Sequence, residues 1–346
     1  MSIPKKIIHQ IRRSSQSDGN SWLDFANFLV YFYKRNKWFW DFSRFWKNFK
    51  DVEIDRPVFL LGVHRGGLTL ISRIIRRHKD FVSVSGNYKY WSGADEMAVV
   101  LGPVLPTEFA GIRHKIPRHS EIEAPTGWIY ACDKFISYFR KTRQDWVPDL
   151  GDKFKKIIKW TINRHAINKS KARLIDKSQI FTVRLSFLNR ALRGSSPKFI
   201  LVTRNPYAIC YWPAKTLMNR KELKLNSFRE ALEITAQHWA NSMKCALEDS
   251  NEVDNFLVIN FEHFLSNPAE DLKKICRFIE VEYSKDLLPQ PCHKIPFGSK
   301  GQNKWYPLRP DVNEKHFKKM TQEDVEIIHE YVGKLAKELG YSKPKL

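Results

Sequence analysis

Short runs of apolar residues alternate along the chain with stretches whose apolar residues recur every three or four positions. The short runs lie at residues 57–61, 81–85, 198–203 and 256–260. Helical spacing occurs at residues 68–77, 153–166, 228–247 and 267–279, and again from residue 321 onward. Continuous apolar runs of this length favour strands that are buried on both faces. The alternation therefore predicts an α/β fold with three layers, a parallel β-sheet flanked by helices.

Two of the predicted helices carry clear start and stop residues. Asn267 is suited to cap a helix whose first residue is Pro268, and Glu270 is placed to complete a capping box. The last helix is predicted to start at Thr321 and to end at Gly340.

Residues 1–50 differ from the rest, because aromatic side chains lie among basic ones without the alternation of a strand. Aromatic residues from Phe25 to Trp46 recur at helical spacing, which predicts one or two amphipathic helices. This helical N-terminal arm either packs on the core or lies on an anionic membrane surface. We expect the α/β domain to cover residues 51–346, with a helical insertion on the substrate side at about residues 94–171.

The composition is that of a globular protein, with 42% hydrophobic and 13% aromatic residues. No apolar run reaches the ~18 residues that a membrane span needs, and the basic N-terminus lacks the apolar centre of a signal peptide. The five cysteines contain no CxxC pair, so we expect reduced thiols and neither zinc nor disulfides. These features predict a cytoplasmic protein, attached to a membrane peripherally at most.

The formal net charge of +22 is large and attracts anions, such as nucleic acid, acidic lipid, or sulfated and phosphorylated ligands. No known nucleic-acid-binding motif occurs in the sequence, so nucleic acid is not an expected partner.

A glycine loop joins the first predicted strand to the helix that follows, with the sequence Gly62-Val63-His64-Arg65-Gly66-Gly67. Such a loop favours phosphate binding, because backbone N–H groups and the helix dipole point at the anion. The loop lacks the Lys-Ser/Thr pair of the GxxxxGK[ST] motif, which argues against an ATP-dependent kinase.

A second candidate phosphate ligand, Arg204, follows the apolar run at residues 198–203 directly, and Asn205-Pro206 turns the chain there. Ligands of parallel sheets bind at this carboxyl edge, where a guanidinium is able to hold a phosphate through two nitrogens. Together, the loop and Arg204 suggest a nucleotide with phosphates at two places.

These segments resemble the family of sulfotransferases that use 3′-phosphoadenosine 5′-phosphosulfate (PAPS). The glycine loop is similar to the family's G-x-P-R-S-G-T-T-L-L, and Arg204-Asn205-Pro206 to its R-[DN]-P motif. The segment "LIDKSQIFTVRLSFL" resembles E-K-[TS]-P…R-L-P-F-L, with Lys177 at the lysine, and "GSKGQNKWYP" resembles a late loop that closes over the nucleotide. The resemblance spans about residues 56–340 and implies a P-loop-NTPase-like sulfotransferase fold.

The resemblance also implies roles for individual residues, with PAPS as the donor and no metal. The implied nucleotide contacts are His64, Arg65, Gly66, Gly67, Leu68, Thr69, Arg204, Ser299 and Lys300. The implied catalytic residues are Arg65, Lys177, Glu96 and Ser299. Arg65 and Lys177 would neutralise the leaving phosphate, and Glu96 would take the proton of the acceptor hydroxyl, with Asp95 and His64 as alternatives.

The chain departs from the family pattern at four positions. His64 replaces the usual proline, Gly66 a serine and Leu68 a threonine, and Trp212 stands where the family often has a serine, eight residues beyond Arg204. Three alternatives follow: another residue such as the nearby Thr216 compensates, PAPS binds weakly, or the chain is a degenerate relative.

Two other functions stay open from the sequence. One is a P-loop-type kinase or phosphotransferase, for which Glu262 is the best candidate magnesium ligand. The other is a non-catalytic binder of acidic polymers or membrane surfaces, which the charge and the missing loop hydroxyls favour. The expected acceptor of a sulfotransferase is a hydroxyl of a glycan, a lipid or a small metabolite, and neither its identity nor the oligomeric state follows from the sequence.

Overall fold

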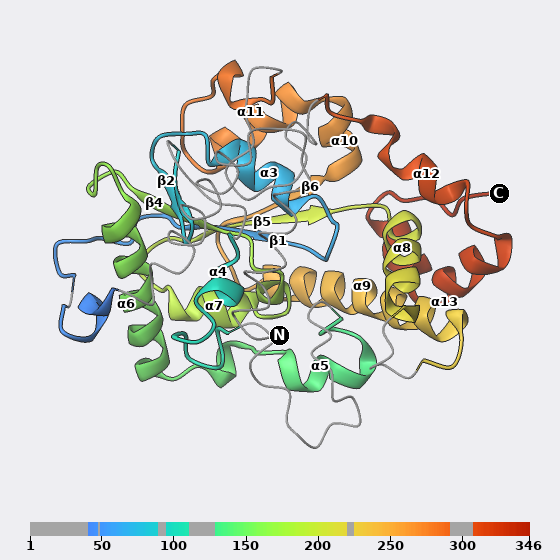
Figure 1. Cartoon of the computed structure of the whole chain (residues 1–346), viewed down its shortest axis with the longest axis horizontal. Helices are drawn as coiled ribbons and strands as arrows, with labels where there is room; N and C mark the ends of the chain where they lie inside the picture. Colours follow the sequence, from blue (N-terminus) through green and yellow to red (C-terminus); the bar gives the residue numbers. More distant parts are fainter. Residues whose placement is uncertain (1–40, 48, 89–94, 111–128, 220–224, 291–306) are drawn as a thin grey trace, which may run out of the picture.

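Figure 1 shows the computed structural model of the chain. The residues that the structure describes are 41–47, 49–88, 95–110, 129–219, 225–290 and 307–346. Most of the predicted N-terminal arm, residues 1–40, lies outside them, so its helices and the domain boundary at residue 50 stay predictions. Among the described residues, every helix is too short or too polar to cross a membrane.

The centre of the fold is a mostly parallel sheet with the strand order β3-β2-β4-β1-β5-β6. The strands are β1 Val58–Leu61, β2 Phe81–Ser83, β3 Gly86–Asn87, β4 Arg173–Asp176, β5 Lys198–Thr203 and β6 Phe256–Asn260. All pairings are parallel except the one between β2 and β3. The four strands expected from apolar runs are confirmed, whereas β3 and β4 were not expected. Because β1 lies between β4 and β5, the loop that follows it is flanked by the ends of both.

Helices connect the strands and enclose the sheet. The α-helices are α3 Leu68–Ile75, α4 Met97–Val100, α5 Asp133–Phe139, α6 Pro148–His165, α7 Leu185–Ala191, α8 Pro206–Met218, α9 Phe228–Ser250, α10 Phe261–Ser266, α11 Pro268–Phe278, α12 Glu314–Phe317 and α13 Gln322–Glu338. Short 3₁₀ turns lie at η1 Phe42–Phe45, η3 Arg143–Asp145, η4 Gln179–Val183, η6 Lys285–Leu287 and η7 Pro310–Asn313.

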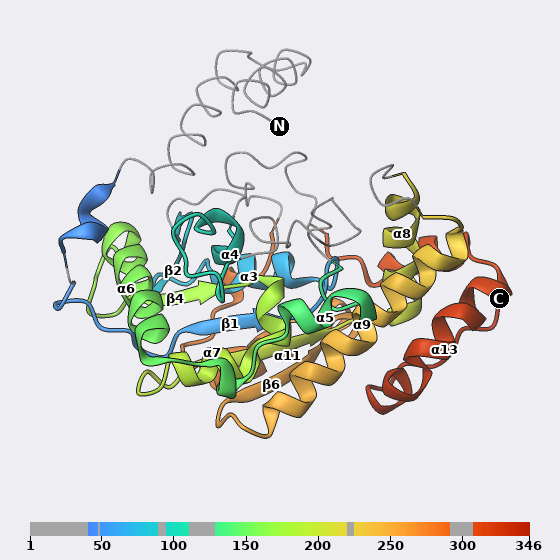
Figure 2. The same cartoon turned by 90° about the horizontal axis from the view of Figure 1, so that it is seen from below.

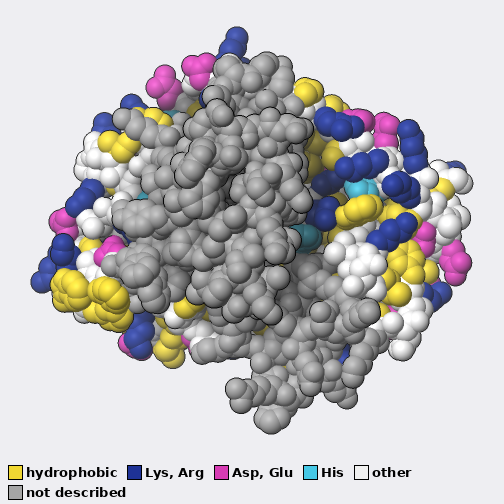
Figure 3. Space-filling model, viewed as in Figure 1, with side chains coloured by type: hydrophobic (Ala, Val, Ile, Leu, Met, Phe, Trp, Pro, Cys, Tyr) yellow, Lys and Arg dark blue, Asp and Glu magenta, His cyan; other side chains and the backbone are white. Residues whose placement is uncertain are grey.

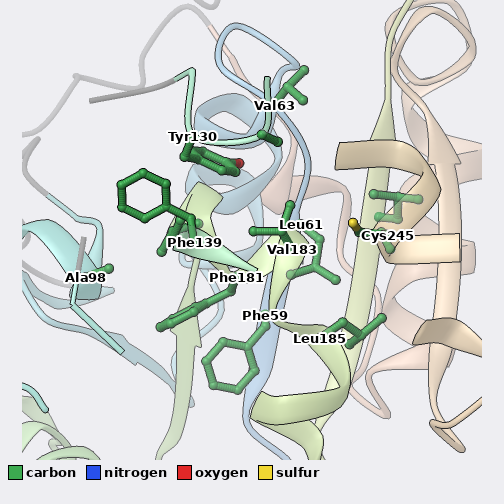
Figure 4. Close-up of a cluster of buried hydrophobic side chains, with 14 of the residues drawn as sticks. Phe59, Leu61, Val63, Ala98, Tyr130, Phe139, Phe181, Val183, Leu185 and Cys245 are labelled. Atoms are coloured by element: carbon green, nitrogen blue, oxygen red, sulfur yellow. The ribbon is translucent and has the colours of Figure 1, made fainter. Parts of the chain in front are cut away.

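Successive side chains of a strand point to opposite faces of the sheet, so alternate residues of each strand belong to two different hydrophobic cores. Val58 and Leu60 pack with residues of α3, α10 and α11. Phe59 and Leu61 pack on the other face with residues of α6, α7 and α9, and Figure 4 shows both among the aromatic and aliphatic side chains of that core. Figures 1 and 2 show the resulting layers, with α13 packed beside α9. The predicted three-layer α/β fold is confirmed.

The predicted helix ends are mostly correct. Thr321 and Asp324 form a capping box at the start of α13, and Gly340, at a φ of +81°, follows its end. Pro268 is the first residue of α11, as expected. The capping box expected from Asn267 is wrong, because its side chain makes no capping hydrogen bond and its backbone is already turned away from an extended cap conformation.

Candidate active site

The loop between β1 and α3 depends on its glycines. Gly67 has a φ of +96°, and a Cβ atom there would lie 2.2 Å from the ring of Phe261 in α10. A Cβ atom on Gly66 would lie 2.9 Å from the carbonyl oxygen of Val63. A side chain on Gly67 would push the loop away from α10, and one on Gly66 would open the turn at Val63, so the glycines allow the backbone to fold tightly at the start of α3.

Fewer backbone N–H groups of the loop are available to an anion than expected. The first N–H groups of a helix have no partner within the helix, so those of Leu68 and Thr69 are available to an anion. The N–H of Gly66 instead donates to the carbonyl of Val63 at 2.9 Å, which closes the turn. Leu68 points its side chain into the core, whereas Thr69 exposes its side chain at the mouth of the loop.

Arg204, at the end of β5, connects that strand to the loop. Its Nη1 donates to the carbonyl oxygen of Arg65 at 2.6 Å, and its Nε and Nη2 donate to Oδ1 of Asn313 at 3.0 and 2.6 Å. The guanidinium also lies over the ring of Phe261, 5.1 Å from its centre. Burial lowers the pKa of Arg204 to about 10, so the group remains a cation at neutral pH. The two predicted phosphate ligands, Arg204 and the glycine loop, are therefore in direct contact.

Glu262, which follows β6, holds the residues around Arg204 in place through hydrogen bonds. Its Oε1 accepts hydrogen bonds from the backbone N–H of Asn205 at 3.0 Å and from Nδ2 of Asn313 at 2.5 Å. Its Oε2 accepts one from the hydroxyl of Tyr341 at 3.3 Å. Both carboxylate oxygens are thus used to hold the neighbours of Arg204, which is a different role from the magnesium ligand that the kinase alternative required.

A second charged cluster lies at the end of β4. Nζ of Lys177 is 2.9 Å from Oε1 of Glu96 and 3.1 Å from Oδ1 of Asp95, and Nη1 of Arg76 is 2.9 Å from the other oxygen of Asp95. Burial opposes the charge of Lys177, but the two carboxylates outweigh it and raise the pKa of the ammonium. Two cations and two carboxylates balance each other here, so the predicted residues Lys177, Glu96 and Asp95 meet as one neutral cluster.

The end of β4 also fixes the backbone next to Glu96. Asp176 accepts hydrogen bonds from the N–H of Met97 at 2.7 Å and from the N–H of Ser178 at 2.8 Å, and Oγ of Ser178 accepts one from Ala98 at 2.9 Å. Burial raises the pKa of Asp176 to about 6. These bonds hold the start of α4, and hence Glu96, beside Lys177.

Thr182 in η4 joins the two clusters through the first residue of the loop. Its hydroxyl oxygen accepts from the N–H of Gly62 at 2.7 Å and donates to the carbonyl of Gly62 at 3.0 Å. The segment that follows Lys177 is thereby attached to the loop that contacts Arg204. Lys177, the glycine loop and Arg204 thus follow the carboxyl ends of the adjacent strands β4, β1 and β5.

The remaining predicted residues lie elsewhere or outside the described part of the chain. His64 is half-buried and adds to the effect of burial, which lowers the pKa of His238 to about 3. The hydroxyl of Thr216 donates to the carbonyl of Trp212 within α8. Ser299 and Lys300 lie outside the described residues. Sequence reasoning missed Asp176, Thr182, Asn313 and the supporting role of Glu262; for Glu262, its position directly after a predicted strand was the available signal.

Metal chemistry has no candidate site in the described part of the chain, where no group of three or more histidine, cysteine, aspartate or glutamate side chains is arranged to hold an ion.

Comparisons with known proteins agree with the fold. Among solved structures, the sulfotransferase domain from the Synechococcus PCC 7002 olefin synthase has 18% identity and a TM-score of 0.51, covering 86% of this chain and 99% of that one. Sulfotransferase STF9 from Mycobacterium avium has 12% identity and a TM-score of 0.51, covering 88% of this chain and 82% of that one. No curated protein matches the sequence. The sequence profile of the Sulfotransferase family matches residues 57–285, well over half of the chain, and the protein therefore belongs to the sulfotransferase family.

Proposed function

We propose that the protein transfers the sulfuryl group of PAPS to a hydroxyl acceptor. The observation that carries this proposal is the 2.6 Å hydrogen bond from Arg204 to the carbonyl of Arg65. It brings a cation at the end of β5 against the glycine loop after β1, so one molecule with phosphates at two places is able to contact both.

The chain's groups fit such a donor. The N–H groups of Leu68 and Thr69, with the Thr69 hydroxyl, would hold the 5′-phosphosulfate at the start of α3. Arg204 would hold the 3′-phosphate, and Asn313 fixes its guanidinium in orientation. Arg65, whose carbonyl is tied to Arg204, keeps its own guanidinium exposed to the same side.

The chemistry requires a base and a cation near the reacting atoms. Glu96 would accept the proton of the acceptor hydroxyl as its oxygen bonds to sulfur, while the bond from sulfur to the 5′-phosphate oxygen breaks and adenosine 3′,5′-bisphosphate leaves. Lys177, 2.9 Å from Glu96, orients that carboxylate and lies beside the developing charge. Asp95, buried between Lys177 and Arg76, holds the ammonium in place rather than acting as the base.

The test is transfer of labelled sulfate from PAPS across a panel of hydroxyl acceptors that includes glycans, lipids and small metabolites. We expect transfer to at least one class, and a loss of about 100-fold or more in the Glu96→Gln variant. The matched control is Glu108→Gln, which alters a carboxylate outside the two charged clusters. Absence of transfer by the parent protein to any acceptor, together with no binding of adenosine 3′,5′-bisphosphate, would contradict the proposal.

Binding also separates this function from the kinase alternative. Adenosine 3′,5′-bisphosphate should raise the melting temperature without magnesium, because the described cations bind phosphate directly. ATP with magnesium should have the smaller effect. A response to ATP and magnesium alone would favour a kinase.

A further inference from the structure

Trp212 is the centre of a cationic cluster of which the proposed chemistry has used only Arg65. The guanidinium of Arg65 lies 5.8 Å from the centre of its ring, and Nζ of Lys319 lies 6.0 Å from it. The ring of His316 in α12 lies 6.0 Å from the same indole. We call Trp212, Arg65, His316 and Lys319 the indole cluster. Figure 3 shows Lys and Arg side chains gathered with histidine on this face, over α8 and α12.

Among the described residues, the cations in and around the indole cluster form no ion pair, although Glu262 acts electrostatically on Arg204 and Lys315 on Asp311. In that part of the chain, none of Arg65, Arg204, Lys315 and Lys319 forms an ion pair with a carboxylate, whereas other cations such as Arg76, Arg140 and Lys198 do. Burial is the main cause that lowers the pKa of His316 to about 4, and Lys315, Arg204, Arg65 and Lys319 all act in the same direction. This surface is therefore a local excess of positive charge, which an anion would stabilise.

The position of the cluster is fixed relative to Arg204. Asn313, which accepts from Arg204, directly precedes α12, and so places His316 one helical turn further along. The hydroxyl of Tyr211 in α8 donates to the carbonyl of Lys319, which attaches the other end of this segment to the helix of Trp212. Because both ends are held, His316 and Lys319 remain on the same side of the sheet edge as Arg204.

Resting on the proposed function, we propose that His316 and Lys319 bind the 3′-phosphate of the donor together with Arg204, and that binding places a proton on His316. These residues take over from the hydroxyl that the family often has at the position of Trp212. Thr216 is not the replacement, because its hydroxyl is used inside α8.

We expect His316 to take up a proton because the negative charge of the 3′-phosphate would offset the positive charge around the imidazole. In the free protein, the charged groups with the largest effect on His316 are cations: Lys315 from its own helix, Lys319 after it, Arg204 from β5 and Arg65 from the loop. Burial and these cations together lower its pKa to about 4, so the imidazole is neutral at pH 7. A phosphate dianion in contact with the ring favours the imidazolium instead, since opposite charges at short range stabilise the charged form.

The experiment is calorimetric titration with adenosine 3′,5′-bisphosphate and with adenosine 5′-monophosphate, which lacks the 3′-phosphate. Titrations at pH 6, 7 and 8 in buffers of different ionisation enthalpy count the protons taken up. The variants are Lys319→Met and His316→Asn, and the matched control is Lys318→Met, an exposed lysine adjacent in sequence.

We expect Lys319→Met to weaken binding of the bisphosphate about fivefold, which is the effect of losing a partly exposed charge contact. Binding of the monophosphate should not change. His316→Asn should remove proton uptake that the parent shows with the bisphosphate, while the phosphate's own titration remains in both proteins. Lys318→Met should behave as the parent.

The outcomes separate the two proposals. If the parent does not bind the bisphosphate, the proposed function fails. If the parent binds it but Lys319→Met weakens both nucleotides equally or neither, and His316→Asn takes up the same number of protons, only the role of the indole cluster is overturned. Lys319 is exposed, so its variant keeps the test valid if His316→Asn does not fold.

Discussion

The two strands beside β1 each end in a buried cation, but the two cations have opposite surroundings. Lys177 after β4 contacts the carboxylates of Glu96 and Asp95, and its charge is balanced before any ligand arrives. Arg204 after β5 donates only to neutral oxygens, a backbone carbonyl and an amide. The comparison indicates that the β5 end is suited to bind an anion, whereas the β4 end is suited to orient a carboxylate. The same residue class at equivalent positions of one sheet thus serves different purposes because its partners differ.

The largest expected effect concerns the balanced cluster at β4. Asp95→Asn should lower the free energy of unfolding by about 3–5 kcal/mol, because it leaves the buried Arg76 and Lys177 without their shared carboxylate. Urea denaturation measures the change. Glu248→Gln, in the exposed pair with Lys244, is the control and should cost less than about 0.5 kcal/mol. Equal and small changes in both variants would show that the charges at β4 do not depend on one another.

The next effect concerns the loop that meets Arg204. Gly67→Ala should lower stability by about 2–3 kcal/mol, since it combines a backbone of positive φ with overlap onto the ring of Phe261. Gly194→Ala is a matched control, because Gly194 has a similar φ of +88° but nothing within 4 Å of an added Cβ. The difference between the two variants in thermal or urea unfolding isolates the overlap. If they are equally unstable, close packing of the loop on α10 is not required.

A smaller effect is expected at the amide that orients Arg204. Asn313→Ala should weaken adenosine 3′,5′-bisphosphate about fivefold to tenfold, because the guanidinium loses its acceptor and its fixed orientation. Calorimetry gives the dissociation constant. Asn189→Ala removes an amide that donates to the carbonyl of Glu252, away from the site, and should leave the affinity unchanged. An unchanged affinity in Asn313→Ala would mean that Arg204 needs no orientation.

The smallest effect is a pH dependence of stability. The folded-state pKa of His316 is about 4, below the ordinary value of 6.5, so the unfolded chain binds more protons between these values. The contribution of neutral His316 is therefore complete above pH 6.5 and is lost as the pH falls toward 4. His316→Asn should reduce the slope of unfolding free energy against pH in this window. Part of the slope should remain, because buried His238 also has a lowered pKa, about 3. An identical slope in both proteins would contradict the assigned burial.

The local patterns of the sequence predicted most of the fold. Continuous apolar runs identified β1, β2, β5 and β6; the first three are buried on both faces, whereas β6, at the edge of the sheet, is mostly half-buried. The strand β4 was missed because Arg173 and Asp176 give "RLID" a polar pattern. Both side chains are buried with hydrogen-bond partners: Arg173 donates to the carbonyls of Arg56 and Ile279, and Asp176 accepts from the N–H groups of Met97 and Ser178.

The site was predictable where a residue follows a recognised strand or matches a family motif. Arg204 was found because it directly follows a predicted strand, whereas Lys177 and Glu96 were found through the family resemblance. Asn313, His316 and Lys319 lie more than 100 residues beyond Arg204, in a short helical segment without periodicity. Their meeting with Arg204 depends on tertiary packing, for which the sequence carries no local signal.

The most direct test of the comparison is to measure the dissociation constant of adenosine 3′,5′-bisphosphate for Arg204→Met and Lys177→Met side by side. Arg204→Met should weaken binding about 30-fold, since it removes a buried cation together with its charge-assisted hydrogen bonds. Lys177→Met should change binding less than about twofold, because Lys177 contacts Asp95 and Glu96 rather than the groups proposed to hold the two phosphates. The opposite order, with Lys177→Met losing affinity and Arg204→Met keeping it, would contradict the assignment of the anion site to the β5 end.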